Sequence, residues 1–262
     1  MFCIEYINAQ YGQSVHMSRR SRVDVRVGVL VPFTNTNLEP DLIRMCPPNC
    51  SLHFQRTGGY DADEIPSLNQ MTKLGKFNLN QDLKMIGGAR PDAILYGCTS
   101  ATLTHGPSFD RDLAIRIEEG SGALTFTAAG SLVSALKALD VQRIGFSSPY
   151  VGAINKQAVA FLEQSGVETV VRADIGYDLG CYGQGELTPD DIYNLALKAD
   201  DPKAQAIVLS CTDMRSVEVI KKIEMDLRKP VVTSNQAMMF CIYKEFNLAR
   251  QPNLPGCLFD TL

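Results

Sequence analysis

Residues 93–99 read AILYGCT, and residues 206–212 read AIVLSCT. Each segment has four hydrophobic residues, then one small residue, then Cys-Thr. A short, continuous apolar run bounded by small residues is typical of a strand that is buried on both faces of a parallel sheet. The chain therefore carries the same strand twice, and the copies end at Cys98 and Cys211.

The repeat extends to both sides of these strands. RVGVLVP at residues 26–32 and RIGFSSP at residues 143–149 each predict a buried strand that is ended by proline, and each precedes one cysteine strand. Beyond the cysteine strands, TAAG at residues 127–130 and TSNQ at residues 233–236 each open a helical pattern. The duplicated order of elements predicts two halves built on one plan.

Helical patterns lie between the predicted strands. Apolar residues recur at three- and four-residue spacing over 68–86, 154–166 and 188–199, and the last segment opens with the cap sequence Thr-Pro-Asp-Asp. Strands that alternate with helices form parallel sheets with right-handed crossovers. We predict an α/β fold of two similar lobes, related by a pseudo-twofold axis, with the active site in the cleft between them.

The repeat also suggests where the lobes divide. The first lobe is expected to contain residues 24–127 plus 233–262, and the second to contain residues 128–232, with helices exchanged between the lobes at the junctions. Residues 1–23 include polar positions where a secretion signal would need unbroken apolar residues, so they are interpreted as an irregular N-terminal extension.

Composition narrows the class of protein. The 262 residues are 45% hydrophobic and 21% charged, which is ordinary for a globular protein, and the formal net charge is −4. That charge argues against a nucleic-acid partner, and no apolar run approaches the ~20 residues that span a bilayer. Eight cysteines without a secretion signal suggest a reducing cytoplasm.

A metal site is not expected. Cys46 and Cys50 have a CxxxC spacing with no second ligand pair, which favours a turn with two incidental thiols over a zinc site. The three histidines do not form an HExxH or HxxxH pattern. We predict neither a metal nor a cofactor.

The two repeated cysteines carry the functional hypothesis. Ligands of open α/β sheets bind beyond the carboxyl ends of the strands, and a pseudo-twofold axis would bring Cys98 and Cys211 to face each other across one cleft. A helix beginning after each cysteine would lower the pKa of its thiol. The backbone N–H groups that follow each cysteine, those of Thr99 and Ser100 and those of Thr212 and Asp213, would bind a carboxylate.

Two thiols on opposite sides of a small acid allow two reactions. One thiolate can remove a Cα proton while the other thiol returns a proton to the opposite face, which is racemisation. Alternatively, a thiolate adds to an activated C=C bond, the bond rotates and elimination gives the other geometric isomer. The alternative is that both cysteines simply pack as small buried hydrophobic residues. The presence of cysteine at equivalent positions in both halves of the repeat weakens this alternative.

Two further side chains are predicted near the same strand ends. Asn35 lies in the loop after the first strand, where its amide would reach a substrate carboxylate or simply cap the following helix. Tyr150 lies in the corresponding loop of the second half, where its hydroxyl would bind the same anion or pack at an interface.

The quoted motifs resemble those of the maleate cis–trans isomerases, a branch of the aspartate/glutamate/hydantoin racemase and arylmalonate decarboxylase superfamily. The resemblance runs from about Arg26 to about Leu248 and rests on VGVLVPFTNTNLE (27–39), ILYGCTSAT (94–102), GFSSPYVGAIN (145–155) and IVLSCTDM (207–214). It implies that Cys98 is the nucleophile of a succinyl-thioether intermediate and that Cys211 handles the proton. It also implies a substrate pocket formed by Asn35, Tyr150, Thr99, Ser100 and Thr212. The decarboxylases keep only one of the two cysteines, which counts against decarboxylation.

Two departures from the isomerase pattern keep other substrates open. Thr99-Ser100 replaces an apolar pair and is closer to the racemases, and Asp178 aligns with a second substrate-binding asparagine. A carboxylate at Asp178 would repel the second carboxylate of maleate by about 1 to 4 kcal/mol at ~4 Å. The alternative is that Asp178 lies in a surface loop.

The sequence thus predicts a cytoplasmic, cofactor-independent isomerase that acts on a small, dicarboxylic acid, with a homo-oligomeric assembly. Cis–trans isomerisation ranks first and racemisation of an amino-acid-like acid second. The third hypothesis is a non-catalytic protein that closes its two lobes on a carboxylate.

Overall fold

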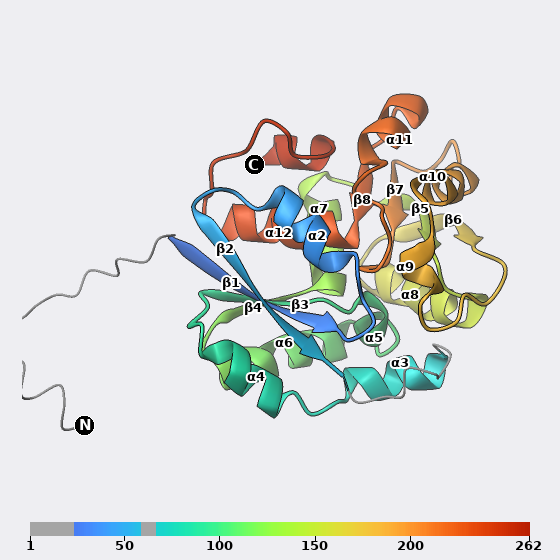
Figure 1. Ribbon diagram of the computed structural model, residues 1–262. Coiled ribbons are helices and arrows are strands. Elements are labelled where there is room, and N and C mark those ends of the chain that lie inside the picture. Colours follow the sequence, from blue (N-terminus) through green and yellow to red (C-terminus); the bar gives the residue numbers. More distant parts are fainter. Residues whose placement is uncertain (1–23, 59–66) are drawn as a thin grey trace, which may run out of the picture.

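The computed structural model describes residues 24–58 and 67–262, and the N-terminal extension predicted at 1–23 lies outside this part. Two four-stranded sheets form the two halves of the molecule, and helices lie between and around them (Figure 1). In the described residues, no helix has both the length and the apolar character that crossing a bilayer requires.

All strands of the first sheet are parallel, and their order is β2-β1-β3-β4. The strands are β1 (Val25–Pro32), β2 (Cys50–Thr57), β3 (Ala93–Tyr96) and β4 (Leu124–Thr127). The residue pairs Val27–Ala93 and Leu30–Tyr96 lie opposite each other, so the first proline strand and the first cysteine strand are neighbours.

The second sheet repeats this plan, with the order β6-β5-β7-β8 and parallel pairing throughout. Its strands are β5 (Arg143–Ser148), β6 (Glu168–Asp174), β7 (Ala206–Leu209) and β8 (Val231–Thr233). Each strand occupies the position of its counterpart four strands earlier. The predicted α/β fold of two similar lobes with parallel sheets is therefore confirmed.

The helices connect the strands of each sheet. In the first half they are α2 (Leu38–Met45), α3 (Leu68–Gly75), α4 (Asn80–Gly87), α5 (Thr99–Leu103) and α6 (Pro107–Ser121). In the second half they are α8 (Gly152–Gln164), α9 (Gly183–Glu186), α10 (Pro189–Lys198) and α11 (Ile220–Leu227). Two further helices, α7 (Ala128–Ala138) and α12 (Ser234–Glu245), follow the last strand of each sheet, and η1 (Cys257–Thr261) lies near the C-terminus.

Helices α7 and α12 join the two halves. Thr127 and Thr233 cap them, because their hydroxyl oxygens accept the N–H groups of Gly130 (2.9 Å) and Gln236 (3.2 Å). The two helices pack against each other in the middle of the molecule (Figure 1), and each contacts both β4 and β8. Because they are shared in this way, the division into 24–127 plus 233–262 and 128–232 stays a prediction.

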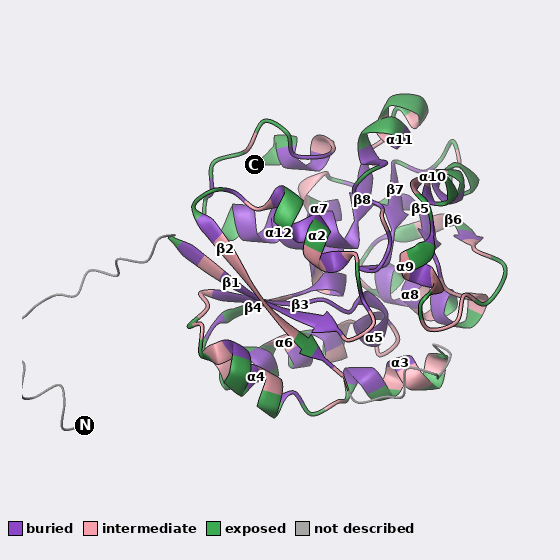
Figure 2. Ribbon diagram, viewed as in Figure 1, coloured by how far each residue is buried: buried purple, intermediate pink, exposed green. Residues whose placement is uncertain are grey.

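The core follows the alternation of side chains along the strands. Val29 and Leu95 of the first sheet belong to a core that also contains Phe146 and Val208 of the second sheet, together with buried residues of α7 and α12. On the other face of the first sheet, Ile94 packs in a smaller cluster with α3, α4 and α6. Buried residues accordingly run through the strands and the central helices, and exposed residues lie on outer helices such as α4 and α11 (Figure 2).

The repeated glycine of the two proline strands has a packing role. A Cβ atom on Gly145 would lie 1.7 Å from the backbone oxygen of Ala199, and one on Gly28 would lie 2.6 Å from the Ile94 side chain. The residue that ends α10 therefore touches the backbone of β5. Only glycine allows this approach to the backbone at residue 145, whereas the atoms nearest Gly28 are the ends of the Ile94 and Ile86 side chains.

One helix prediction was wrong in its extent, and the four strands β2, β4, β6 and β8 were not predicted. Residues 68–86 form two helices, α3 and α4, because Gly75 lies against the backbone of α5 and Asn78 accepts the N–H of Asn80 at 2.9 Å. An asparagine that binds a nearby backbone N–H competes with helical hydrogen bonding. The turn predicted at Cys46 and Cys50 is present between α2 and β2.

Candidate active site

A pocket lies where the carboxyl ends of strands from both sheets meet. It encloses about 550 Å³, including its open mouth. The residues that line it are Pro32, Thr34, Asn35, Gln70, Met71, Leu74, Cys98, Ser100, Tyr150, Cys181, Gln184, Thr212 and Asp213. Both halves of the repeat therefore contribute to one site, as the duplicated strand ends predicted.

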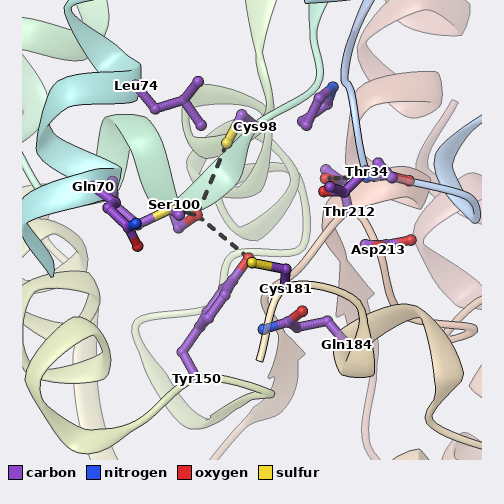
Figure 3. Close-up of a pocket in the computed structure, with 13 residues that line it drawn as sticks. Thr34, Gln70, Leu74, Cys98, Ser100, Tyr150, Cys181, Gln184, Thr212 and Asp213 are labelled. Carbon is purple, nitrogen blue, oxygen red and sulfur yellow. Dashed lines mark hydrogen bonds between the residues drawn. The ribbon is translucent and has the colours of Figure 1, made fainter. Parts of the chain in front are cut away.

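A series of polar contacts connects the two repeated cysteines. The Cys98 sulfur lies 3.9 Å from the Ser100 hydroxyl, and that hydroxyl lies 3.4 Å from the phenol oxygen of Tyr150 (Figure 3). The same phenol oxygen lies 3.5 Å from the Cys211 sulfur. Cys98 is part of the pocket wall, whereas Cys211 is 1% exposed and is reached through the Tyr150 hydroxyl.

Both thiols have raised pKa values, which differs from the expectation that a following helix would lower them. Burial raises the pKa of Cys98, although the Ala101 N–H and the Ser100 hydroxyl act in the opposite direction. Burial also raises the pKa of Cys211 to about 12. The reason is that α5 has only five residues and that a turn rather than a helix follows Cys211, so desolvation outweighs any helix dipole.

Asn35 connects the two halves at the pocket wall. Its side-chain oxygen accepts hydrogen bonds from the N–H groups of Asn37 (3.1 Å) and Leu38 (2.9 Å) at the start of α2. This oxygen therefore has the helix-capping role that was the alternative to substrate binding. Its side-chain nitrogen donates to the Thr212 hydroxyl at 3.0 Å, and Thr212 donates to the Gly97 carbonyl at 2.8 Å. Asn35 and Thr212 thus fix the loop after β1 to the loop after β7.

Asp213 strengthens the same connection. Its Oδ1 atom accepts the N–H of Thr36 (2.9 Å), the N–H of Asn37 (3.1 Å) and the side-chain amide of Asn37 (3.0 Å). Burial raises the pKa of the Asp213 carboxyl, and these donors partly offset the rise. In Figure 3 the carboxyl end of Asp213 points away from Cys98 and Ser100.

Two sequence-predicted residues lie outside the pocket lining. Thr99 is buried and donates its hydroxyl to Ser234 at 3.0 Å, so its side chain links α5 to α12. Asp178 is exposed, and its carboxylate accepts the N–H of Gly180 at 3.0 Å within the β6–α9 loop. The assignment of Asp178 as a pocket residue is thus corrected in favour of the surface-loop alternative, since a short turn ties its side chain to its own loop.

Other residues of the pocket were not predicted. Cys181 and Gln184 reach it from the segment that follows Asp178, and Gln70, Met71 and Leu74 reach it from α3. Figure 3 shows Gln70 and Gln184 on opposite sides of Ser100 and Tyr150. The motifs that repeat between the two halves do not include α3 or the segment from Cys181 to Gln184. The repeat therefore gave no signal for these side chains.

The described part of the pocket lining carries no positively charged side chain. Among its described lining residues there is no lysine, arginine or histidine, and the donors are amides, hydroxyls and backbone N–H groups. Tyr150 stays protonated, because burial and the neighbouring cysteines raise its pKa. Within residues 24–58 and 67–262, no group of three His, Cys, Asp or Glu side chains is placed to hold a metal ion.

Comparison with known proteins agrees with this geometry. The arylmalonate decarboxylase family model matches residues 27–259. The chain is 25% identical over 235 residues to the maleate isomerase of Geobacillus stearothermophilus, covering 85% of this chain and 92% of that protein. It is also 25% identical over 237 residues to the maleate isomerase of Nocardia farcinica, covering 85% and 90%.

A solved structure of a cysteine-to-serine mutant of the Nocardia farcinica enzyme, with a covalently bound succinylcysteine intermediate, superposes with a TM-score of 0.80 at 24% identity and covers 90% of this chain and 98% of that one. At that identity the superposition establishes a shared fold. The family match spans both sheets and every residue of the described pocket. The chain therefore belongs to the arylmalonate decarboxylase family.

Proposed function

We propose that this protein is a maleate cis–trans isomerase that uses Cys98 as nucleophile and Cys211 as proton carrier. The observation that carries the proposal is the contact series from Cys98 through Ser100 and Tyr150 to Cys211 at one pocket wall. The two curated relatives described above are maleate isomerases, which supports the same reaction.

The reaction begins with the Cys98 thiolate. Its sulfur forms a bond to C2 of maleate, and the π electrons of the C2=C3 bond move to C3 and its carboxylate. The Tyr150 hydroxyl transfers its proton to C3 and takes the proton of the Cys211 thiol, giving a succinyl thioether whose C2–C3 bond is single and free to rotate. After rotation, a proton leaves C3 and returns through the Tyr150 hydroxyl to the Cys211 thiolate, the double bond re-forms, and the C2–S bond breaks with its electron pair returning to Cys98. Fumarate is released, with the Cys98 thiolate and the Cys211 thiol regenerated.

Neutral donors hold the two carboxylates in this proposal. The Asn35 amide and the Tyr150 hydroxyl line the pocket, and Gln70 and Gln184 lie on opposite sides of Ser100 and Tyr150 (Figure 3). Donors fixed by the protein stabilise the charge that develops on the carboxylate after thiolate addition. Cys98 is favoured as the nucleophile because the Ala101 N–H and the Ser100 hydroxyl both support its thiolate.

The first test follows fumarate formation from maleate by proton NMR. The unsubstituted protein and Cys46→Ser are expected to convert maleate, because Cys46 lies in the α2–β2 turn away from the pocket. Cys98→Ser and Cys211→Ser are each expected to lose at least about 10³-fold in kcat, since the first removes the nucleophile and the second removes the source of the proton. Unchanged turnover in either variant would refute the assigned role.

The second test separates the two cysteines by intact mass. Cys211→Ser incubated with maleate is expected to retain one succinyl adduct on Cys98, whereas Cys98→Ser is expected to retain none. An adduct found only on Cys211 would reverse the roles. Absence of fumarate together with incorporation of deuterium at Cα of aspartate or glutamate in D₂O would move the assignment to racemisation.

A further inference from the structure

The two halves of the repeat differ in charge at the second residue after each cysteine. Cys98-Thr99 is followed by Ser100, and Cys211-Thr212 is followed by Asp213. Strands β3 and β7, which lead to the two cysteines, occupy equivalent places in their own sheets, because each lies second from an edge. A pseudo-symmetric pocket with two cysteines needs a feature that makes one of them different, and this position provides it.

The environment of Cys98 is neutral. Besides burial, the groups that act on its sulfur are the Ala101 N–H and the Ser100 hydroxyl, and both favour the thiolate. The Ser100 hydroxyl lies 3.9 Å from the sulfur. A hydroxyl can donate to a thiolate without placing a charge beside it.

The environment of Cys211 is anionic. The Asp213 N–H donates to the Cys211 sulfur at 3.3 Å, which fixes Asp213 next to the thiol. After burial itself, the charge of Asp213 is the strongest influence raising the pKa of Cys211, and the hydrogen bonds from the Tyr150 hydroxyl and the Asp213 N–H act in the opposite direction. The other titratable groups that face this sulfur are Tyr150, from the loop after β5, and Cys98, from the end of β3.

The Asp213 carboxyl is fixed by donors of the other lobe, and these partly offset the burial that raises its pKa. Its Oδ1 atom accepts three hydrogen bonds from Thr36 and Asn37, at 2.9 to 3.1 Å. The residue is 9% exposed, so bulk water screens its charge only weakly. The loop that carries Asn35 thus also fixes the carboxyl beside Cys211.

We propose that Asp213 is a positioning residue that keeps the proton on Cys211, so that Cys98 alone supplies the attacking thiolate. This inference rests on the proposed function for its catalytic meaning, but the ordering of the two thiols is a property of the protein without substrate. Asp213 acts through Cys211, and Ser100 leaves Cys98 free to ionise first.

The test measures the pH dependence of thiol modification at each cysteine. Both sites are labelled with methyl methanethiosulfonate, and peptide mass spectrometry reports the rate at Cys98 and Cys211 separately. In Asp213→Asn, an amide oxygen replaces Oδ1 as the acceptor of the Thr36 and Asn37 donors, so the loop contacts are kept. The midpoint for Cys211 is expected to fall by about one pH unit, while that for Cys98 stays in place. Asp226→Asn, at the exposed end of α11, controls for net charge.

A reciprocal variant keeps the test decisive if Asp213→Asn folds poorly. Ser100→Asp places a carboxylate beside Cys98 and is expected to raise its midpoint while leaving Cys211 unchanged. An unshifted Cys211 in Asp213→Asn, or equal shifts at both thiols, would overturn the inference. These readouts need no turnover, so they stand apart from the maleate assay. If maleate is converted, the alkaline limb of its pH–rate profile is expected to shift down in Asp213→Asn by the same amount.

Discussion

Replacing Asp41 by asparagine tests how the protein stabilises a buried acid behind the pocket. Asp41 lies in α2, is 5% exposed, and accepts the side-chain N–H of Asn235 at 2.8 Å. Asn235 also donates to the backbone oxygen of Thr212 at 3.1 Å, so this acid supports the pocket wall. Burial raises the pKa of Asp41 to about 7, although Asn235 and Arg44 partly oppose the rise.

The magnitude follows from the difference in proton affinity between the folded and unfolded states. The Asp41 pKa rises from 3.8 to about 7, which corresponds to about 4 kcal/mol at about 1.4 kcal/mol per pH unit. The raised pKa means that the folded state binds the proton more tightly. The contribution is therefore fully present below pH 3.8, is lost as pH rises to about 7, and is constant above that value.

The assay is urea unfolding of both proteins at several values between about pH 4.5 and about pH 7.5. Asp41→Asn cannot titrate, and its amide oxygen can still accept from Asn235. The free energy of unfolding of the variant, relative to the parent protein, is expected to rise by about 1.4 kcal/mol per pH unit up to about pH 6 and to level off above about pH 7. Asp191→Asn is the control: because the pKa of exposed Asp191 is lowered from 3.8, its contribution is lost only as the pH falls below that value, and the relative stability of this variant is expected to stay nearly constant across the range. A pH-independent difference for Asp41→Asn would refute the reasoning.

Three further predictions concern stability, each measured by urea unfolding. Gly145→Ala is expected to lower the free energy of unfolding by more than about 3 kcal/mol, the upper end of the usual cost of overpacking, because the added Cβ would lie 1.7 Å from the Ala199 oxygen. Gly87→Ala, where the added Cβ would meet open space, is expected to be neutral or stabilising. Thr188→Ala removes the cap of α10 and is expected to cost about 1 kcal/mol. Tyr243→Phe leaves a carbonyl at the end of α2 without its 2.9 Å donor and is expected to cost about 1–3 kcal/mol. A loss at Gly87 equal to that at Gly145, or no loss at Thr188 or Tyr243, would contradict these assignments.

The repeat made the sheets predictable, because their inner strands are buried on both faces and therefore continuously apolar. The same logic missed the edge strand β2, whose sequence CSLHFQRT is mostly half-exposed and reads as a polar segment. The cap sequence at Thr188 was specific enough to place the start of α10 correctly.

The pocket could be predicted only where it follows from strand ends. Cys98, Asn35 and Thr212 lie there because the loops of parallel strands meet at one edge. Met71 and Gln184 belong to separate helices, and their arrival at the pocket depends on long-range packing that leaves no local pattern. The protonation of the thiols was also beyond local reasoning, because it depends on the total burial around each sulfur.

The sharing of α12 by both halves has a consequence for biosynthesis. Every strand of the two sheets leaves the ribosome before α12 does, yet residues Ser234 to Tyr243 of that helix are buried. Until α12 is released, the apolar faces that it covers on β4 and β8 have no partner. Both halves therefore complete their folding only when α12 docks, and until then the uncovered apolar surface favours aggregation of the nascent chain.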